Sequence, residues 1–310
     1  NYGLREHSDA DERHCARLCE QLQIELVSVR EPRSPALAAA LGGGAAQGAP
    51  ATRAGSGNLQ AWAREVRYRA AGARALERGA QIATAHTASD QVETILYRLA
   101  ASPGRRALLG MQAVQAGRPG PRLIRPLLGV SREHTAAYCS ERGLRWRDDE
   151  SNCDEQYARV RVRQGLLPAL RAVHPAAEAS VLKTAQLLRE EAEVLDGLVS
   201  DELAGAQEIS IARLAALPAA LARLLVIALA EHAAGTYVPQ AGARVQEILA
   251  LGRRGGRAEL HVGGQAGAVI EGGLLRMVKL PPRGTPLARG GDGRLEGELD
   301  SPTWPVPRAP

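Results

Sequence analysis

The chain is long enough for one large domain or two ordinary ones, and its composition is that of a folded protein. Its 310 residues are 45% hydrophobic, 24% charged and 3% aromatic, with no Phe, so the core must rest on Leu, Val, Ile and Ala. No apolar run is long enough to span a membrane and no signal peptide is visible, which predicts a cytoplasmic protein with no membrane partner.

The charge balance is basic and rests on arginine. The net charge is +5, and Lys183 and Lys279 are the only lysines. Guanidinium groups suit phosphate and carboxylate, so a polyanionic partner is one interpretation. A coding preference for Arg over Lys is the other, and composition does not separate them. The four cysteines include no Cys-x-x-Cys pair, which favours reduced thiols and no metal site.

The first half of the chain alternates helical and strand-like patterns. The predicted helices and strands are, in chain order, a helix over 9–22, a strand over 24–29, a helix over 58–79, a strand over 81–85, a helix over 89–101, a strand over 122–128 and a helix over 131–143. Asn58 and Ser131 are the expected N-caps. Residues 33–57, rich in Ala, Gly and Pro, are predicted as a surface loop. This alternation predicts an α/β fold with a parallel sheet.

After Pro175 the pattern becomes mainly helical. Apolar residues recur in steps of three and four from Val181 to Val199, which predicts one long helix. A helix over 218–234, short strands separated by Gly pairs over 258–280 and a disordered tail over 281–310 are expected to follow. The predicted organisation is an α/β domain over 1–173, a connecting helix over 174–200, a smaller, mainly helical domain over 201–280 and the tail.

Three ionisable residues crowd the junction between the strand at 81–85 and the next helix: His86, Asp90 and Glu93. Asp90 and Glu93 are three apart and share a helix face, where two carboxylates could hold an ammonium group or a magnesium ion. Thr87 and Asp90 also match the capping-box pattern, which explains Asp90 without any ligand. Spacing alone leaves both interpretations open.

Closely spaced arginines are candidate phosphate or nucleic-acid contacts. Arg159, Arg161 and Arg163 alternate, and on a helix Arg159 and Arg163 share a face. Arg64 and Arg67 lie on one face of the helix predicted over 58–79. Solvated charged faces are the alternative. No G-x-x-x-x-G-K-[ST] loop and no G-x-G-x-x-G after a strand is present.

Several short segments, in order, resemble motifs of the tRNA(Ile)-lysidine synthase family, in the PP-loop ATP-pyrophosphatase superfamily. The six are "NYGLR" (1–5), "NLQAWAREVRY" (58–68), "AHTASDQVETILYRL" (85–99), "LLGM" (108–111), "IRPLLGVSRE" (124–133) and "DDESNCDEQYARVRVR" (148–163). Together they are more specific than any one motif. The resemblance implies a parallel-sheet PP-loop ATP-pyrophosphatase domain (adenine nucleotide alpha hydrolase-like) over 1–173 and a helical tRNA-binding domain over 201–280.

The resemblance implies a ligase that modifies tRNA. Such enzymes use ATP to adenylate the C2 carbonyl oxygen of the wobble cytidine in a tRNA(Ile) with a CAU anticodon, and free L-lysine then displaces AMP to form lysidine. It also implies that Asp90, Glu93 and His86 form the catalytic lysine pocket, with ATP and Mg²⁺ as cofactors. The implied phosphate or tRNA contacts are Arg64, Arg67, Arg125, Arg159 and Arg163. A homodimer is neither implied nor excluded.

The chain departs from the family pattern in places. The ATP-binding signature S-G-G-x-D-S, expected before "GLR", is absent, and the chain begins at Asn1 without Met. We therefore expect the first strand and the phosphate loop to precede Asn1, and the chain as given to be inactive without them. Ser89 stands where the family usually has Asp. The alternatives are a catalytically inactive tRNA-binding paralogue and another PP-loop tRNA modifier such as a cytidine thiolase, against which the absence of paired cysteines counts.

Overall fold

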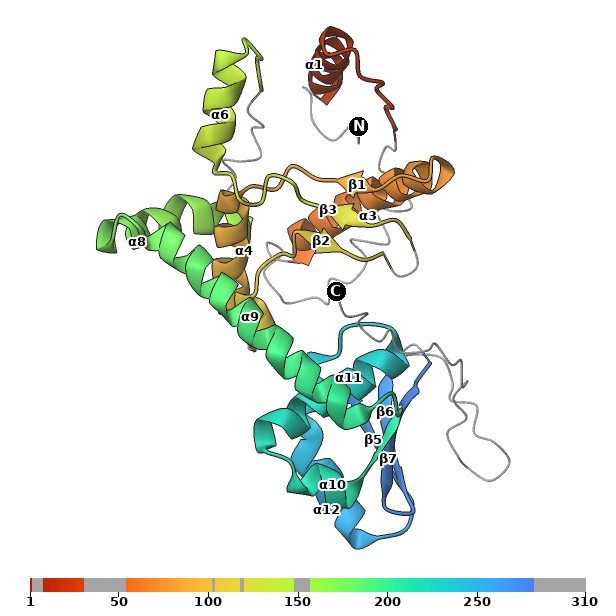
Figure 1. Ribbon diagram of the computed structural model, residues 1–310. Helices are drawn as coiled ribbons and strands as arrows, with labels where there is room; N and C mark the ends of the chain where they lie inside the picture. Colours follow the sequence, from red (N-terminus) through yellow and green to blue (C-terminus); the bar gives the residue numbers. More distant parts are fainter. Residues whose placement is uncertain (2–7, 31–53, 102–103, 118–119, 148–156, 282–310) are drawn as a thin grey trace. The chain divides into compact units, whose positions relative to one another are not determined.

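The structure is a computed structural model that describes residues 1, 8–30, 54–101, 104–117, 120–147 and 157–281. The chain divides into two compact units, Asn1–Leu188 and Arg189–Pro310. The helices and strands of each unit are labelled in Figure 1. Within the described residues, no helix combines the length and the apolar character needed to cross a lipid bilayer.

The first unit contains a small sheet and the helices around it. Its helices are α1 (Ser8–Gln21), α3 (Ala54–Glu77), α4 (Ala88–Ala101), α5 (Arg105–Leu108), α6 (Arg132–Glu141), α7 (Ala158–Arg161) and α8 (Leu167–Val173), with the π-helical turn η2 (Val162–Leu166) between the last two. Its strands are β1 (Ile82–Ala83), β2 (Val114–Gln115) and β3 (Leu123–Ile124), in the order β1-β3-β2. β1 and β3 are parallel, with Ile82 opposite Leu123, whereas β2 is antiparallel to β3. The parallel pair agrees with the predicted α/β class.

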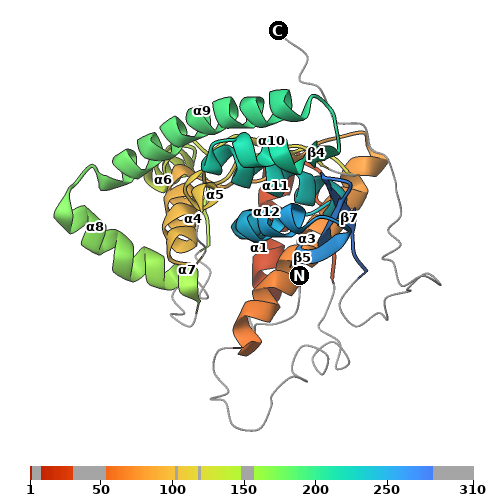
Figure 2. The ribbon, with the colours of Figure 1, turned by 90° about the horizontal axis from the view of Figure 1, so that it is seen from below.

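Helix α4 is the element on which the core of the first unit rests. Val92 and Leu96 of α4 pack against Val162 and Leu167, and α4 lies against α7 and η2 (Figure 2). Because α4 follows directly after β1, this packing fixes the carboxyl end of β1 beside η2. Polar residues in the first turns of α4 therefore meet those of η2.

The "LLGM" segment is held on α4 by one buried glutamine. The amide nitrogen of Gln91 donates to the carbonyl oxygen of Met111 at 2.9 Å, and its amide oxygen accepts from the N–H of Met111 at 2.7 Å. Gly110 has φ +67°, and a Cβ there would lie 2.8 Å from Gln91. The left-handed backbone and the close approach both require glycine at this position.

The second unit combines three helices with an antiparallel sheet. Helix α9 (Ala177–Leu203) begins in the first unit and ends in the second. The elements that follow are β4 (Glu208–Ser210), α10 (Ile211–Ala216), α11 (Ala219–Ala234), the 3₁₀ turn η3 (Pro239–Arg244), α12 (Val245–Arg254), β5 (Ala258–Gly263), β6 (Ala266–Glu271) and β7 (Leu274–Lys279). All neighbouring strands are antiparallel, in the order β4-β7-β6-β5.

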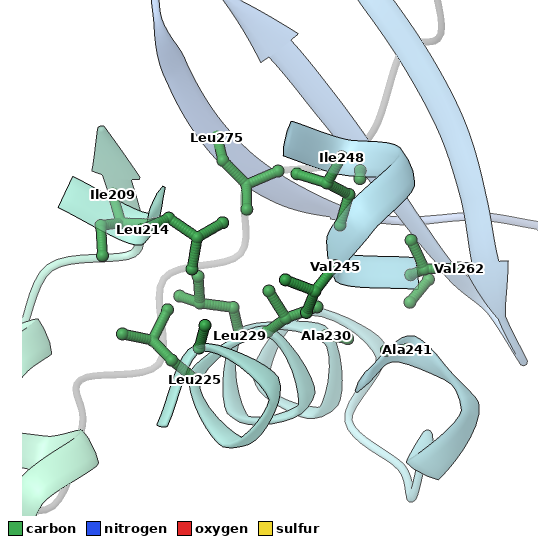
Figure 3. Packing of buried hydrophobic residues seen from close by; sticks show 14 of the residues in the cluster. Ile209, Leu214, Leu225, Leu229, Ala230, Ala241, Val245, Ile248, Val262 and Leu275 are labelled. Carbon is green, nitrogen blue, oxygen red and sulfur yellow. The ribbon is translucent and has the colours of Figure 1, made fainter. Parts of the chain in front are cut away.

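The core of the second unit lies between its helices and its sheet. Leu225 of α11, Ile248 of α12 and Leu275 of β7 are completely buried and form part of one apolar cluster (Figure 3). Strand β6 contributes Ala268 and Ile270 to the same cluster, because alternate residues of a strand face one side of the sheet. The unit therefore has a hydrophobic core of its own.

Most of the predicted helices are confirmed, and some boundaries and strands were wrong. The Oγ of Ser131 accepts a hydrogen bond from the N–H of His134 at 3.2 Å, which confirms the predicted N-cap of α6. Helix α3 begins at Ala54, so residues 54–57 are helical instead of loop and Asn58 is not the N-cap. Residues 33–53 of the predicted loop and 282–310 of the predicted tail lie outside the described residues.

The strand predicted over 24–29 is wrong for this structure, because these residues form no strand with any described segment. A strand needs a neighbour that completes its ladder of backbone hydrogen bonds, and hydrophobic alternation does not supply one. β1 and β3 are also shorter than the predicted runs 81–85 and 122–128. The strands over 258–280 are confirmed, with Gly272 and Gly273 at positive φ in the turn between β6 and β7.

Replacing Leu225 with Ala should destabilise the protein by about 3 kcal/mol, because the side chain is fully buried and its removal leaves a cavity. The matched control is Leu274→Ala on β7, since Leu274 is 40% exposed, and it should cost about 1 kcal/mol or less. Urea denaturation followed by circular dichroism measures both. Equal losses would contradict the location of the core.

Candidate functional site

Asp90 lies in the first turn of α4 and uses its two oxygens differently. Its Oδ2 accepts hydrogen bonds from the backbone N–H and the hydroxyl of Thr87, both at 2.8 Å, and its own N–H donates to the Oγ1 of Thr87 at 3.4 Å. This confirms the capping box. Its Oδ1 accepts from the Nη2 of Arg132 at 3.1 Å. Asp90 therefore caps the helix and also presents one oxygen to a cation.

The pKa of Asp90 reflects these contacts. Burial by itself raises it, but the hydrogen bonds from Thr87, with the charge of Arg132, more than offset burial, so that the pKa lies below its ordinary value. Asp90 is therefore a carboxylate at neutral pH.

Glu93 lies one turn further along α4 and is only 2% exposed. Arg163 binds its carboxylate as a fork, with Nε donating to Oε1 at 2.7 Å and Nη2 donating to Oε2 at 3.1 Å. The Nη2 of Arg132 donates to the same Oε1 at 3.4 Å. A buried carboxylate requires such compensation, so Glu93 joins α4 to both η2 and α6.

Arg132 is the site residue that the sequence interpretation missed. It is the first residue of α6, directly after the N-cap Ser131, and its N–H donates to the Oγ of Ser89 at 3.3 Å. Ser89, at the position where the family usually has Asp, thereby ties the start of α6 to the start of α4. The quoted "IRPLLGVSRE" segment contains Arg132, but no spacing rule connects it with residues some forty positions earlier.

The closely spaced arginines Arg159 and Arg163 have different surroundings. Arg163 lies in η2, and its guanidinium pairs with Glu93, whereas a phosphate or tRNA contact was predicted for it. Arg159, one turn earlier on α7, is exposed and lies near enough to His86 to lower the pKa of that imidazole. A π-helical turn shifts the side chains that follow it, and such turns are frequent at functional sites.

His86 follows β1, and its Nδ1 is 2.9 Å from the hydroxyl of Thr84. Burial lowers the pKa of His86. The charge of Asp90 raises it, whereas the guanidinium groups of Arg125, Arg64 and Arg159 lower it further, and the net pKa lies below its ordinary value of 6.5. The imidazole is therefore uncharged at neutral pH.

Two of the predicted phosphate contacts lie on the His86 side of the site. The guanidinium of Arg64 stacks over the ring of Tyr68, 4.7 Å from its centre. Burial lowers the pKa of Arg125; Tyr68 raises it, the charge of Arg64 lowers it, and the net pKa lies below the ordinary value. Arg125 is buried and donates to the carbonyl of Gln112 at 2.7 Å and to the side chain of Gln115 at 3.2 Å. Its buried Nε–H meets no acceptor among the described residues.

Arg67 lies apart from this group. It lines a hollow of about 700 Å³ together with Val27, Val66 and other residues of the segments 24–29 and α3. The two predicted contacts on this helix therefore have different surroundings. Arg64 lies near enough to His86 to lower its pKa, whereas Arg67 borders a hollow that Glu25, Arg74 and Arg78 also line.

The carboxylate pair of Asp90 and Glu93 does not fit the magnesium ion that its spacing alone allowed. All four carboxylate oxygens of Asp90 and Glu93 accept hydrogen bonds from Thr87, Arg132 or Arg163. Magnesium would have to replace these donors, and positively charged groups already surround the pair. No group of three or more His, Cys, Asp or Glu that could hold a metal occurs in the described part of the chain.

The imidazole of His86 should titrate with a midpoint below 6.5 in NMR, with the resonance assigned by its loss in His86→Gln. Asp90→Asn should lower the midpoint further, because the charge of Asp90 favours the protonated ring. Since the unfolded chain binds this proton more tightly, the contribution of His86 to stability is complete above about pH 6.5 and declines as the pH falls through the window below it. A midpoint above 6.5 would contradict the assignment.

Comparison with known proteins agrees with the motifs. A family model described as a PP-loop domain matches residues 1–170. A tRNA(Ile)-lysidine synthase of Chromobacterium violaceum is 36% identical over 204 residues, which cover 66% of this chain and 42% of the relative. That of Nocardia farcinica is 42% identical over 180 residues, or 56% of this chain and 54% of the relative. That of Salinispora tropica is 43% identical over 176 residues, or 54% and 53%.

The chain spans about half the length of the curated relatives it matches. Among solved structures, the U34-tRNA thiolase NcsA of Methanococcus maripaludis, with its [4Fe-4S] cluster, aligns with a TM-score of 0.44 and 14% identity, over 61% of this chain and 60% of that chain. Because the PP-loop model matches more than half of the residues, the chain belongs to the PP-loop domain family.

Proposed function

We propose that the complete protein is a tRNA(Ile)-lysidine synthase, a ligase that uses ATP to join L-lysine to C2 of the wobble cytidine of a CAU-anticodon tRNA(Ile). One observation carries the proposal: the carboxylates of Asp90 and Glu93 hold a cation between them, the guanidinium of Arg132. The relatives that bear this name, at 36% to 43% identity, support it.

The charges at the pair suit an amine substrate. Asp90 stays ionised at neutral pH because its pKa is lowered, and His86 is uncharged because its own is lowered. The neighbouring imidazole therefore adds no positive charge that would repel an ammonium group. Held between two carboxylates on one helix face, the ε-amine of lysine loses its freedom to rotate and is oriented for attack.

The proposed reaction has two displacements. The C2 carbonyl oxygen of the cytidine forms a bond to the α-phosphorus of ATP, and pyrophosphate leaves. The ε-ammonium of lysine gives a proton to solvent, and the free amine then bonds to C2. The C2–O bond breaks, AMP departs with that oxygen, and the second proton that the nitrogen loses also passes to solvent. Adenylation is needed because the carbonyl oxygen is otherwise a poor leaving group.

The arginines around His86 are the proposed contacts for the phosphates of ATP and tRNA. Arg64 and Arg159 are exposed, and the buried Nε–H of Arg125 offers one further donor. A donor left buried without an acceptor is costly, so a bound anion at this place would be favoured. The second unit is proposed to bind tRNA outside the anticodon. No step is assigned to magnesium.

A catalytically inactive tRNA-binding paralogue is the second candidate, and a specific observation favours it. Every oxygen of the carboxylate pair already accepts a hydrogen bond from within the chain, as inert structural ion pairs do. Lysine transfer by the complete gene product distinguishes the two, because the paralogue would bind tRNA without transferring lysine.

Glu93→Gln should reduce lysine transfer by about 100-fold in the complete gene product, because it removes the charge and keeps the shape of the side chain. Pyrophosphate release with tRNA and ATP should persist, since adenylation does not use the amine. Glu141→Gln on α6, where Glu141 is exposed, is the control and should transfer lysine normally. Normal transfer by Glu93→Gln would exclude the lysine pocket.

Arg64→Gln should weaken tRNA binding and lower the slope of log affinity against log salt by about 1, because one phosphate contact is lost. Arg142→Gln, at the exposed end of α6, is the control and should leave the slope unchanged. Filter binding at several salt concentrations measures both. An equal loss in the two variants would refute a phosphate contact by Arg64.

A further inference from the structure

We infer that Arg132 is a built-in occupant of the amine pocket, which the substrate ammonium must displace, so that Arg132 sets the affinity of the pocket for its amine. This inference rests on the proposed function. It assigns Arg132 a role beyond its structural ion pair with the buried carboxylate of Glu93.

The geometry places one nitrogen of Arg132 where an ammonium would lie. Its Nη2 is 3.1 Å from Oδ1 of Asp90 and 3.4 Å from Oε1 of Glu93. An ammonium carries three donors on one nitrogen and would satisfy the same two oxygens from the same place. The guanidinium and the substrate cannot both occupy that position.

The substrate can displace the side chain of Arg132 from the carboxylates, whereas Arg163 keeps its ion pair with Glu93. Arg163 grips Glu93 with two nitrogens, at 2.7 and 3.1 Å, and its side chain is 29% exposed. Arg132 reaches the pair with one nitrogen, and its side chain is 41% exposed. A bidentate pair is stronger than contacts made through one nitrogen, so Arg132 is displaced more easily than Arg163.

The backbone of Arg132 is fixed, which confines the change to its side chain. Its N–H donates to Ser89, and its carbonyl accepts from the hydroxyl of Thr135 at 2.8 Å. The side chain can therefore swing into solvent without a shift of α6. Because arginine remains charged at every accessible pH, this competitor is always present.

Occupancy by Arg132 lowers the apparent affinity for the amine by the fraction of pockets that are free. Removal of this partly exposed guanidinium, which contacts the pair through one nitrogen, should accordingly change the affinity about two- to tenfold. The expected sign is unusual, because deleting a residue of the pocket should tighten substrate binding.

Arg132→Gln in the complete gene product tests this sign. We expect the KM for L-lysine, and its Kd by calorimetry, to fall about two- to tenfold while kcat changes little. Arg142→Gln, at the other end of α6 and exposed, is the control and should match the unaltered protein. Arg132→Lys, which keeps the charge but reaches less far, should lower the KM by a smaller factor.

Guanidinium ion provides a readout that a structural role would not give. At millimolar concentration it should raise the KM for L-lysine in Arg132→Ala towards the value of the unaltered protein, because it refills the vacated position. It should raise the KM much less when Arg132 is present.

The outcomes separate this inference from the proposed function. An unaltered protein that transfers no lysine refutes the proposed function, and the inference with it. A protein that transfers lysine, with a KM that is unchanged or raised in Arg132→Gln, refutes only the role of Arg132. The thermal transition shows whether Arg132→Gln folds. If it does not fold, Arg132→Lys provides the test, and a KM for L-lysine at or above that of the unaltered protein then overturns the inference.

Discussion

The buried charge of Glu93 is the constraint from which the site is built. A carboxylate that is 2% exposed is strongly disfavoured unless charged donors replace its lost water. Arg163 and Arg132 supply them from positions 70 and 39 residues further along the chain. The ion pairs of Glu93 thus hold the π-helical turn η2 and the start of α6 close to the end of β1. The contacts that stabilise the fold also bring the residues of the site together.

The capping box and the ligand site, which are alternatives when only the sequence is considered, are compatible in the structure. Asp90 gives Oδ2 to Thr87 and Oδ1 to the cation. The cap fixes the rotation of the carboxylate, and so it directs the second oxygen at the guanidinium of Arg132. The capping role of Asp90 therefore positions the oxygen that binds the cation.

How much the sequence predicts depends on whether the signal is local. Ser131 as an N-cap and the strands separated by glycine pairs were predicted because each depends on residues a few positions apart. Arg132 was missed because its partners are remote and a single arginine after an N-cap has no pattern of its own. The strand over 24–29 was wrong because hydrophobic alternation describes a strand's faces and does not provide the neighbour that it must pair with.

The different contacts of Arg163 and Arg132 also determine the net charge of the pocket. Asp90 and Glu93 carry two negative charges, and the fork of Arg163 neutralises one of them permanently. With Arg132 in place the group is neutral, and with Arg132 displaced it holds one negative charge, which matches a single ammonium. A lysine residue substituted for Arg163 could not form that fork, because its ammonium is a point charge that could contact either carboxylate. Arginine at position 163 therefore keeps Glu93 paired, and the remaining negative charge of the two carboxylates can bind one further cation.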